Sequence, residues 1–116
     1  MSEGHFDLLT SEKDRINGFS ARRAARVLAG TIILANAGEP FLQILDANGA
    51  ARNVQLPLET ANDGSMMLIV NIAAGAFALT LQSNAGAALS PAVTVAQNKA
   101  ALVFCDGTAW RSLNGA

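Results

Sequence analysis

From Thr31 onward, short apolar runs alternate with residues that favour turns. This alternation is the sequence feature that most constrains the fold. The runs are Thr31 to Leu34, Phe41 to Leu45, Asn53 to Leu56, Met66 to Ile72, Phe77 to Gln82, Val93 to Val95, Leu102 to Cys105 and Trp110 to Leu113. Turn pairs such as Asn48-Gly49 and Asp106-Gly107 separate them, and Pro57 ends the third run. Short runs at such intervals are typical of an all-β protein, so we expect a small β-sandwich or a barrel-like module. No period is regular enough to predict a solenoid.

The first 30 residues differ in composition from the rest of the chain. We expect them to form an N-terminal arm with a short helix, separate from a body of residues 31–116. Ser20 can cap a helix over Ala21 to Ala29, and Gly30 suits the position after its end. The arm also carries apolar residues that we assign to docking on a partner protein, namely Phe6, Leu8, Leu9, Ile16 and Phe19. The alternative is that these side chains fold back onto their own domain.

The apolar content of the chain predicts self-association. The chain is 51% hydrophobic but only 5% aromatic, and alanine supplies much of the apolar count. Alanine clusters stand at Ala73, Ala74 and Ala76 and at Ala85, Ala87 and Ala88. An alanine-rich core buries little area and usually needs help from a partner. In addition, Met66 to Ile72 is apolar at nearly every position, which indicates a strand covered on both faces. We assign self-association to Met67 and Ile69.

Charge and hydropathy argue against nucleic-acid and membrane partners. The net charge is −1, whereas nucleic-acid binders normally carry a basic excess. The cluster Arg22, Arg23 and Arg26 stands close to Glu12 and Asp14. The longest apolar stretch is too short to cross a bilayer, and the first residues contain no apolar run of signal-peptide length. We therefore expect a soluble protein made in a cytoplasm.

The residues that could carry chemistry are few, and we expect no enzyme activity, no metal and no cofactor. The chain has one histidine, His5, and one cysteine, Cys105, which we expect to be a small buried residue. One of each cannot complete a zinc shell within a monomer. The acids Asp46, Asp63 and Asp106 occupy turns, where carboxylates bond to local backbone. No glycine-rich phosphate loop is present.

Trp110 and Arg111 allow two interpretations. An exposed tryptophan beside an arginine can anchor an interface or stack on a glycan. Alternatively, Trp110 closes the bottom of the sandwich, and this is the interpretation that we favour.

The order of several short motifs resembles a β module of phage structural proteins. The motifs are Ala35-Asn36-Ala37-Gly38-Glu39-Pro40-Phe41-Leu42, Val54-Gln55-Leu56-Pro57, Ile69-Val70-Asn71-Ile72, Leu79-Thr80-Leu81 and Leu102-Val103-Phe104-Cys105-Asp106-Gly107-Thr108-Ala109-Trp110-Arg111. Similar modules occur in tail fibres, tail spikes and head fibres or decorations, and the resemblance covers about residues 31 to 113. It implies a β-sandwich-like, often trimeric part of a virion.

The function that we expect is that of a head decoration (cement) protein, which stabilises the phage capsid through non-covalent contacts. Its partners would be further copies of itself, in a homotrimer, and the major capsid protein. Two alternatives remain open at this stage. One is a tail-fibre or receptor-binding module that grips a host glycan, and the other is a small cytosolic enzyme or ligand-binding barrel.

Overall fold

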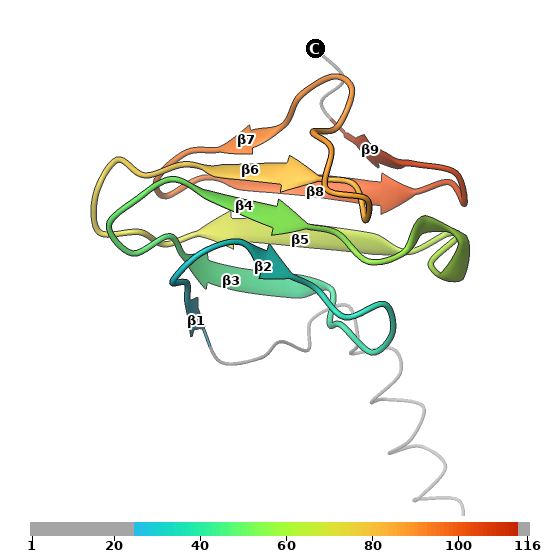
Figure 1. Cartoon of the computed structure of the whole chain (residues 1–116), viewed down its shortest axis with the longest axis horizontal. Helices are drawn as coiled ribbons and strands as arrows, with labels where there is room; N and C mark the ends of the chain where they lie inside the picture. The colour runs from blue at the N-terminus through green and yellow to red at the C-terminus, as the bar shows by residue number, and fades with distance from the viewer. Residues whose placement is uncertain (1–24, 114–116) are drawn as a thin grey trace, which may run out of the picture.

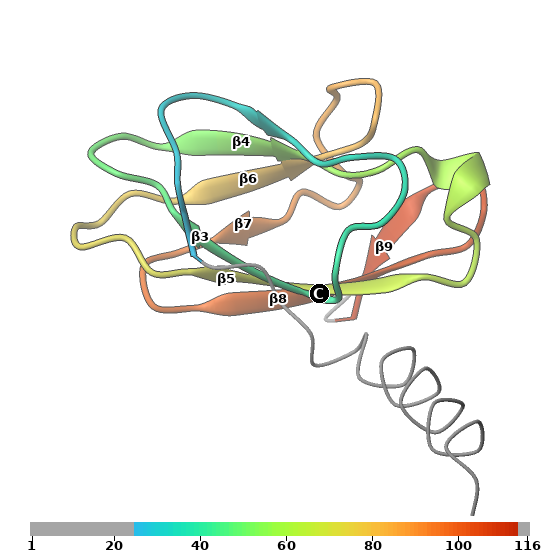
Figure 2. The same ribbon diagram turned by 90° about the horizontal axis from the view of Figure 1, so that it is seen from below.

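The computed structural model describes residues 25–113, and within them the chain forms two β-sheets that pack face to face (Figures 1 and 2). The strands are β1 (Arg26–Val27), β2 (Ile32–Ile33), β3 (Leu42–Asp46), β4 (Arg52–Gln55), β5 (Met66–Asn71), β6 (Leu79–Gln82), β7 (Thr94–Val95), β8 (Ala100–Cys105) and β9 (Trp110–Ser112), with a short 3-10 helix at Glu59–Ala61 between β4 and β5. The expected all-β sandwich is confirmed, and the sheets do not close into a barrel.

The chain passes from one sheet to the other at each step through its first six strands. Of these six, the odd-numbered strands enter one sheet and the even-numbered strands enter the other. The complete sheets have the orders β1-β3-β5-β8-β9 and β2-β4-β6-β7. Neighbours are therefore parallel from β1 to β3 to β5 and from β2 to β4 to β6. The last strands add antiparallel pairs, β6 with β7 and β5 with β8 and then β9.

The chain winds regularly from sheet to sheet, but its sequence shows no repeat because the segments between paired strands differ in length. Arg26 pairs with Leu45, and Leu45 pairs with Asn71, so successive register partners stand at unequal distances along the chain. Asn48 and Gly49 both adopt positive φ, which Asn-Gly turns favour. Their turn links β3 to β4 across the two sheets rather than within one. Gly107, with a φ of 88°, lies in the β8–β9 hairpin, as predicted.

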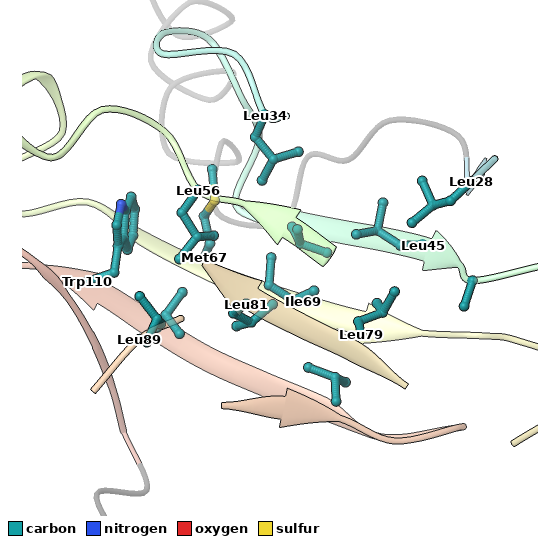
Figure 3. Packing of buried hydrophobic residues seen from close by; sticks show 14 of the residues in the cluster. Leu28, Leu34, Leu45, Leu56, Met67, Ile69, Leu79, Leu81, Leu89 and Trp110 are labelled. Atoms are coloured by element: carbon teal, nitrogen blue, oxygen red, sulfur yellow. The ribbon is translucent and has the colours of Figure 1, made fainter. Parts of the chain in front are cut away.

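The core lies between the sheets and is built from large side chains (Figure 3). Leu45 and Ile69 enter it from the five-stranded sheet, and Leu79 and Leu81 enter it from the four-stranded sheet. The buried hydrophobic residues include only two alanines, Ala47 and Ala73. The expectation of an alanine-rich core is therefore wrong. Most members of the alanine clusters are exposed, namely Ala74, Ala76, Ala85, Ala87 and Ala88.

The boundary of the body lies earlier than the sequence predicted. Residues 26 and 27 form β1 where the pattern predicted the end of a helix, so the helix prediction is wrong for residues 25–29, and residues 21–24 lie outside the described part of the chain. Leu28 is buried, and its N–H donates to the Asp46 carbonyl at 2.8 Å. On the inner side, Arg26 bonds to the side chains of Glu39 and Gln43. These tertiary contacts outweigh the helix propensity of the segment.

Candidate functional site

The outer face of the five-stranded sheet is apolar along every one of its long strands. Met66, Leu68 and Val70 of β5 alternate with the buried residues of that strand and point away from the core. The register aligns them with apolar neighbours, so that Leu68 lies between Leu42 and Leu102. We call the whole set the apolar face: Val27, Leu42, Ile44, Met66, Leu68, Val70, Ala100, Leu102 and Phe104.

The opposite surface of the sandwich is polar at the equivalent positions. There the outward side chains form rows across β4, β6 and β7, and these rows contain Asn53, Gln55, Thr80, Gln82 and Thr94. Ile33 of β2 is the apolar member of this surface. Both sheets have one face on the same core, but only one of them presents an apolar surface outward.

Charged side chains stand at the rim of the apolar face and not within it. Asp46 ends β3 at one edge, and Arg111 lies on the edge strand β9, opposite Phe104. Arg111 donates to Asp106 at 3.0 Å in an exposed ion pair. Hydrogen bonds from the Ala109 and Thr108 backbone N–H groups, and then from Arg111, lower the pKa of Asp106 to about 2.

The structure places the two residues assigned to self-association in the core. Met67 is 3% exposed and Ile69 is fully buried, and both point toward the four-stranded sheet. Their side chains are therefore not available to another chain, and that assignment is wrong. The error arose because a run of apolar residues shows no alternation, so the sequence could not tell the inner set from the outer set. The surface that it missed is Met66, Leu68 and Val70.

Trp110 is buried as well, and the interpretation that it closes the sandwich is confirmed. Its ring is 2% exposed, and its indole N–H donates to the Pro57 carbonyl at 2.9 Å. A ring in this position cannot stack on a glycan. Arg111 is exposed on the other side of the same strand. The pair therefore does not form the anchor that we considered.

Several residues of the quoted motifs hold loops to the core. Asn71, which ends β5, is fully buried and donates from its amide to the carbonyls of Phe77 and Val95 at 2.7 and 2.9 Å. Its side-chain oxygen accepts from the Ala73 N–H at 3.0 Å. One side chain thus joins the end of β5, the following loop and β7.

A second network of asparagines lies at the opposite end of the sandwich. The Asn36 side-chain oxygen accepts from the Leu58 N–H at 2.9 Å and from the Asn84 amide at 3.1 Å. The Asn62 amide donates to the carbonyls of Asn36 and Leu58. These bonds connect the loops after β2, β4 and β6, so the motif residues here serve the fold.

Cys105 is buried, as predicted. Its thiol donates to the Glu59 carbonyl at 3.3 Å, and burial raises the pKa of this thiol above its usual value. A raised pKa keeps the sulfur in its less nucleophilic form at neutral pH. Asp46 also behaves as predicted, because its carboxylate accepts from the Asn48 N–H at 2.9 Å.

An open groove of about 650 Å³ lies beside β8, where the segment of residues 91–94 passes the end of β9. Its lining is about equally polar and apolar and includes Val93, Ala101 and Leu113, with Thr94 and Ser112 as its hydroxyl groups. The lining contains no titratable side chain. Within residues 25–113, no group of three or more His, Cys, Asp or Glu side chains could hold a metal ion.

The arm residues assigned to docking, Phe6, Leu8, Leu9, Ile16 and Phe19, and the single histidine His5 lie outside the described part of the chain. In the part that is described, no helix is long and apolar enough to cross a membrane. Comparisons of the chain with protein families, with curated proteins and with solved structures found no match.

Proposed function

We propose that this chain is a non-enzymatic structural protein of a bacteriophage particle, and more specifically a head decoration protein. The observation that carries the proposal is the apolar face, a continuous surface with charges only at its rim. Contiguous exposed apolar patches of several hundred Å² mark sites of protein contact. The resemblance of the motif order to phage β modules is the reason for placing the chain in a phage particle.

A decoration protein of this kind acts through binding energy alone. It binds across neighbouring shell subunits, so that pulling the shell apart also requires breaking its contacts. The β-sandwich would be the rigid body of a homotrimer, as the resemblance implies. The apolar residues of the arm would make contacts with the major capsid protein. An arm that orders on binding loses conformational entropy, and several arms on one oligomer would offset that loss through avidity.

The test is to measure the copy number of the chain in purified particles of the phage or prophage that encodes it. Quantitative mass spectrometry against the major capsid protein should give hundreds of copies per particle. A few copies would indicate a tail component, and absence from the particle would contradict the proposal.

A second measurement addresses the arm. Heads that lack the chain should disassemble at a lower temperature and should regain stability when the purified protein is added. The full chain with Leu8→Asp and Leu9→Asp should bind these heads at least tenfold more weakly than the wild type. The control is Thr80→Asp on the polar surface of the body, which should bind as the wild type does. Equal binding by the arm variant would exclude a docking role for these residues.

A further inference from the structure

We infer that the apolar face is covered by a second copy of this chain. This inference deepens the proposed function, which requires a contact surface but does not say what occupies it. It also replaces Met67 and Ile69 with a set of side chains that another chain can reach.

The composition of the face favours a copy of the chain over a partner that binds and leaves. Nine of the eleven outward side chains of this sheet are apolar, and the two charged ones, Asp46 and Arg111, lie at the edges of the face. Homomeric interfaces are the apolar class, whereas the surfaces of transient complexes are about as polar as the rest of a protein. A centre without charge surrounded by a polar rim is also the usual anatomy of a stable contact.

The size of the face fits one partner of the same size. The face spans β1, β3, β5 and β8, which contain 2, 5, 6 and 6 residues. With strands about 4.8 Å apart and about 3.3 Å per residue, they give a flat patch of about 300 Å². Two such patches remove about 600 Å² from water as flat areas, and the uneven side-chain surface adds to this. Specific interfaces begin at about 1,000–1,200 Å², so a pair of copies would use the whole face. Such a face-to-face pair is a twofold dimer and not the trimer that the resemblance implies.

This area has a consequence for the particle. A face that is fully occupied by another copy cannot also bind the capsid. Contact with the shell must then be made elsewhere, which agrees with the docking role proposed for the arm. Val27, Met66 and Phe104 are the most exposed of the large side chains in the face, at 66%, 39% and 37%, so the contact would bury most new area at these three residues.

The test is the mass of the full chain in solution, measured by sedimentation velocity from about 1 to 100 μM. The wild type should sediment as a multiple of 12.0 kDa. Leu68→Arg places a charge in the centre of the face without touching the core, so the same measurement should give the monomer mass. The matched control is Thr80→Arg, which adds the same charge to the polar surface of the other sheet and should leave the oligomer intact.

The fold of each variant is checked by Trp110 fluorescence and circular dichroism. Should Leu68→Arg fail to fold, Met66→Lys with Phe104→Lys replaces it, because both side chains are already exposed. A monomeric wild type at 100 μM, an oligomer unchanged by charge on the apolar face, or equal dissociation by Thr80→Arg would each overturn the inference. A chain that self-associates but is absent from particles would refute only the proposed function. A monomer found on particles would refute only the inference.

Discussion

Asn71 offers the sharpest test of how this fold is held together. Its side chain is fully buried and makes three hydrogen bonds, to the Phe77 and Val95 carbonyls and from the Ala73 N–H. Asn71→Ala removes all three and leaves their partners away from water. A neutral hydrogen bond contributes about 1 kcal/mol net, and an unsatisfied buried group costs about 1–3 kcal/mol. We therefore expect a loss of about 3 kcal/mol in the free energy of unfolding.

The measurement is urea unfolding followed by the fluorescence of Trp110, the only tryptophan. With a slope of about 1.5 kcal/mol/M, a loss of about 3 kcal/mol lowers the midpoint by about 2 M. All variants are compared at one protein concentration, because self-association raises apparent stability. The isosteric Asn71→Asp should be at least as destabilised at pH 7, since a carboxylate cannot donate to the two carbonyls.

The matched control is Asn53→Ala, which truncates an exposed asparagine on β4 and should leave the midpoint within about 0.3 M of the wild type. If Asn71→Ala lowered the midpoint no more than Asn53→Ala does, the hydrogen bonds of Asn71 would not stabilise the fold. An Asn71→Ala chain that fails to fold while Asn53→Ala folds normally would agree with the expected direction.

Two further outcomes follow from the same structure. Trp110→Phe keeps an aromatic ring in the core but loses the hydrogen bond to the Pro57 carbonyl. Thermal unfolding followed by circular dichroism should show a loss of about 1–2 kcal/mol in the free energy of unfolding. An unchanged melting temperature would contradict this role of the bond. The pKa of Asp106 is lowered from 3.8 to about 2 in the folded state, so its stabilising effect is complete above pH 3.8 and is lost as the pH falls toward 2. Asp106→Asn should therefore lose less stability between pH 4 and pH 2 than the wild type, and equal acid sensitivity would show that this carboxylate does not contribute.

Most of the strands could be predicted from the sequence because turn residues delimit them. The run Met66 to Ile72 corresponds to β5, and Phe41 to Leu45 overlaps β3 within one residue at each end. The Asp106-Gly107 hairpin was equally clear, because the turn chemistry there is local. Such elements depend on neighbours in sequence, which is why the pattern is sufficient to find them.

The parallel pairing of the first six strands could not be predicted in this way. The pairing of Arg26 with Leu45 joins segments that share no local signal, and the same is true of Val54 with Leu81. The placement of β1 in a segment of good helix formers depends on the same long-range contacts. The inward and outward residues of β5 could not be distinguished either, because both sets consist mainly of large apolar side chains.

The contrast between the two outer surfaces is not required by the fold. Each sheet needs one apolar side to cover the core, and the four-stranded sheet meets that need with polar residues outside. Strand propensity does not explain the difference either, since threonine suits a strand as well as valine does and stands at Thr80 and Thr94 on the polar surface. Leu68 and Leu102, at the equivalent outward positions of the other sheet, bury nothing in the core. The contact with another copy that we propose would give these residues a physical role that folding alone does not.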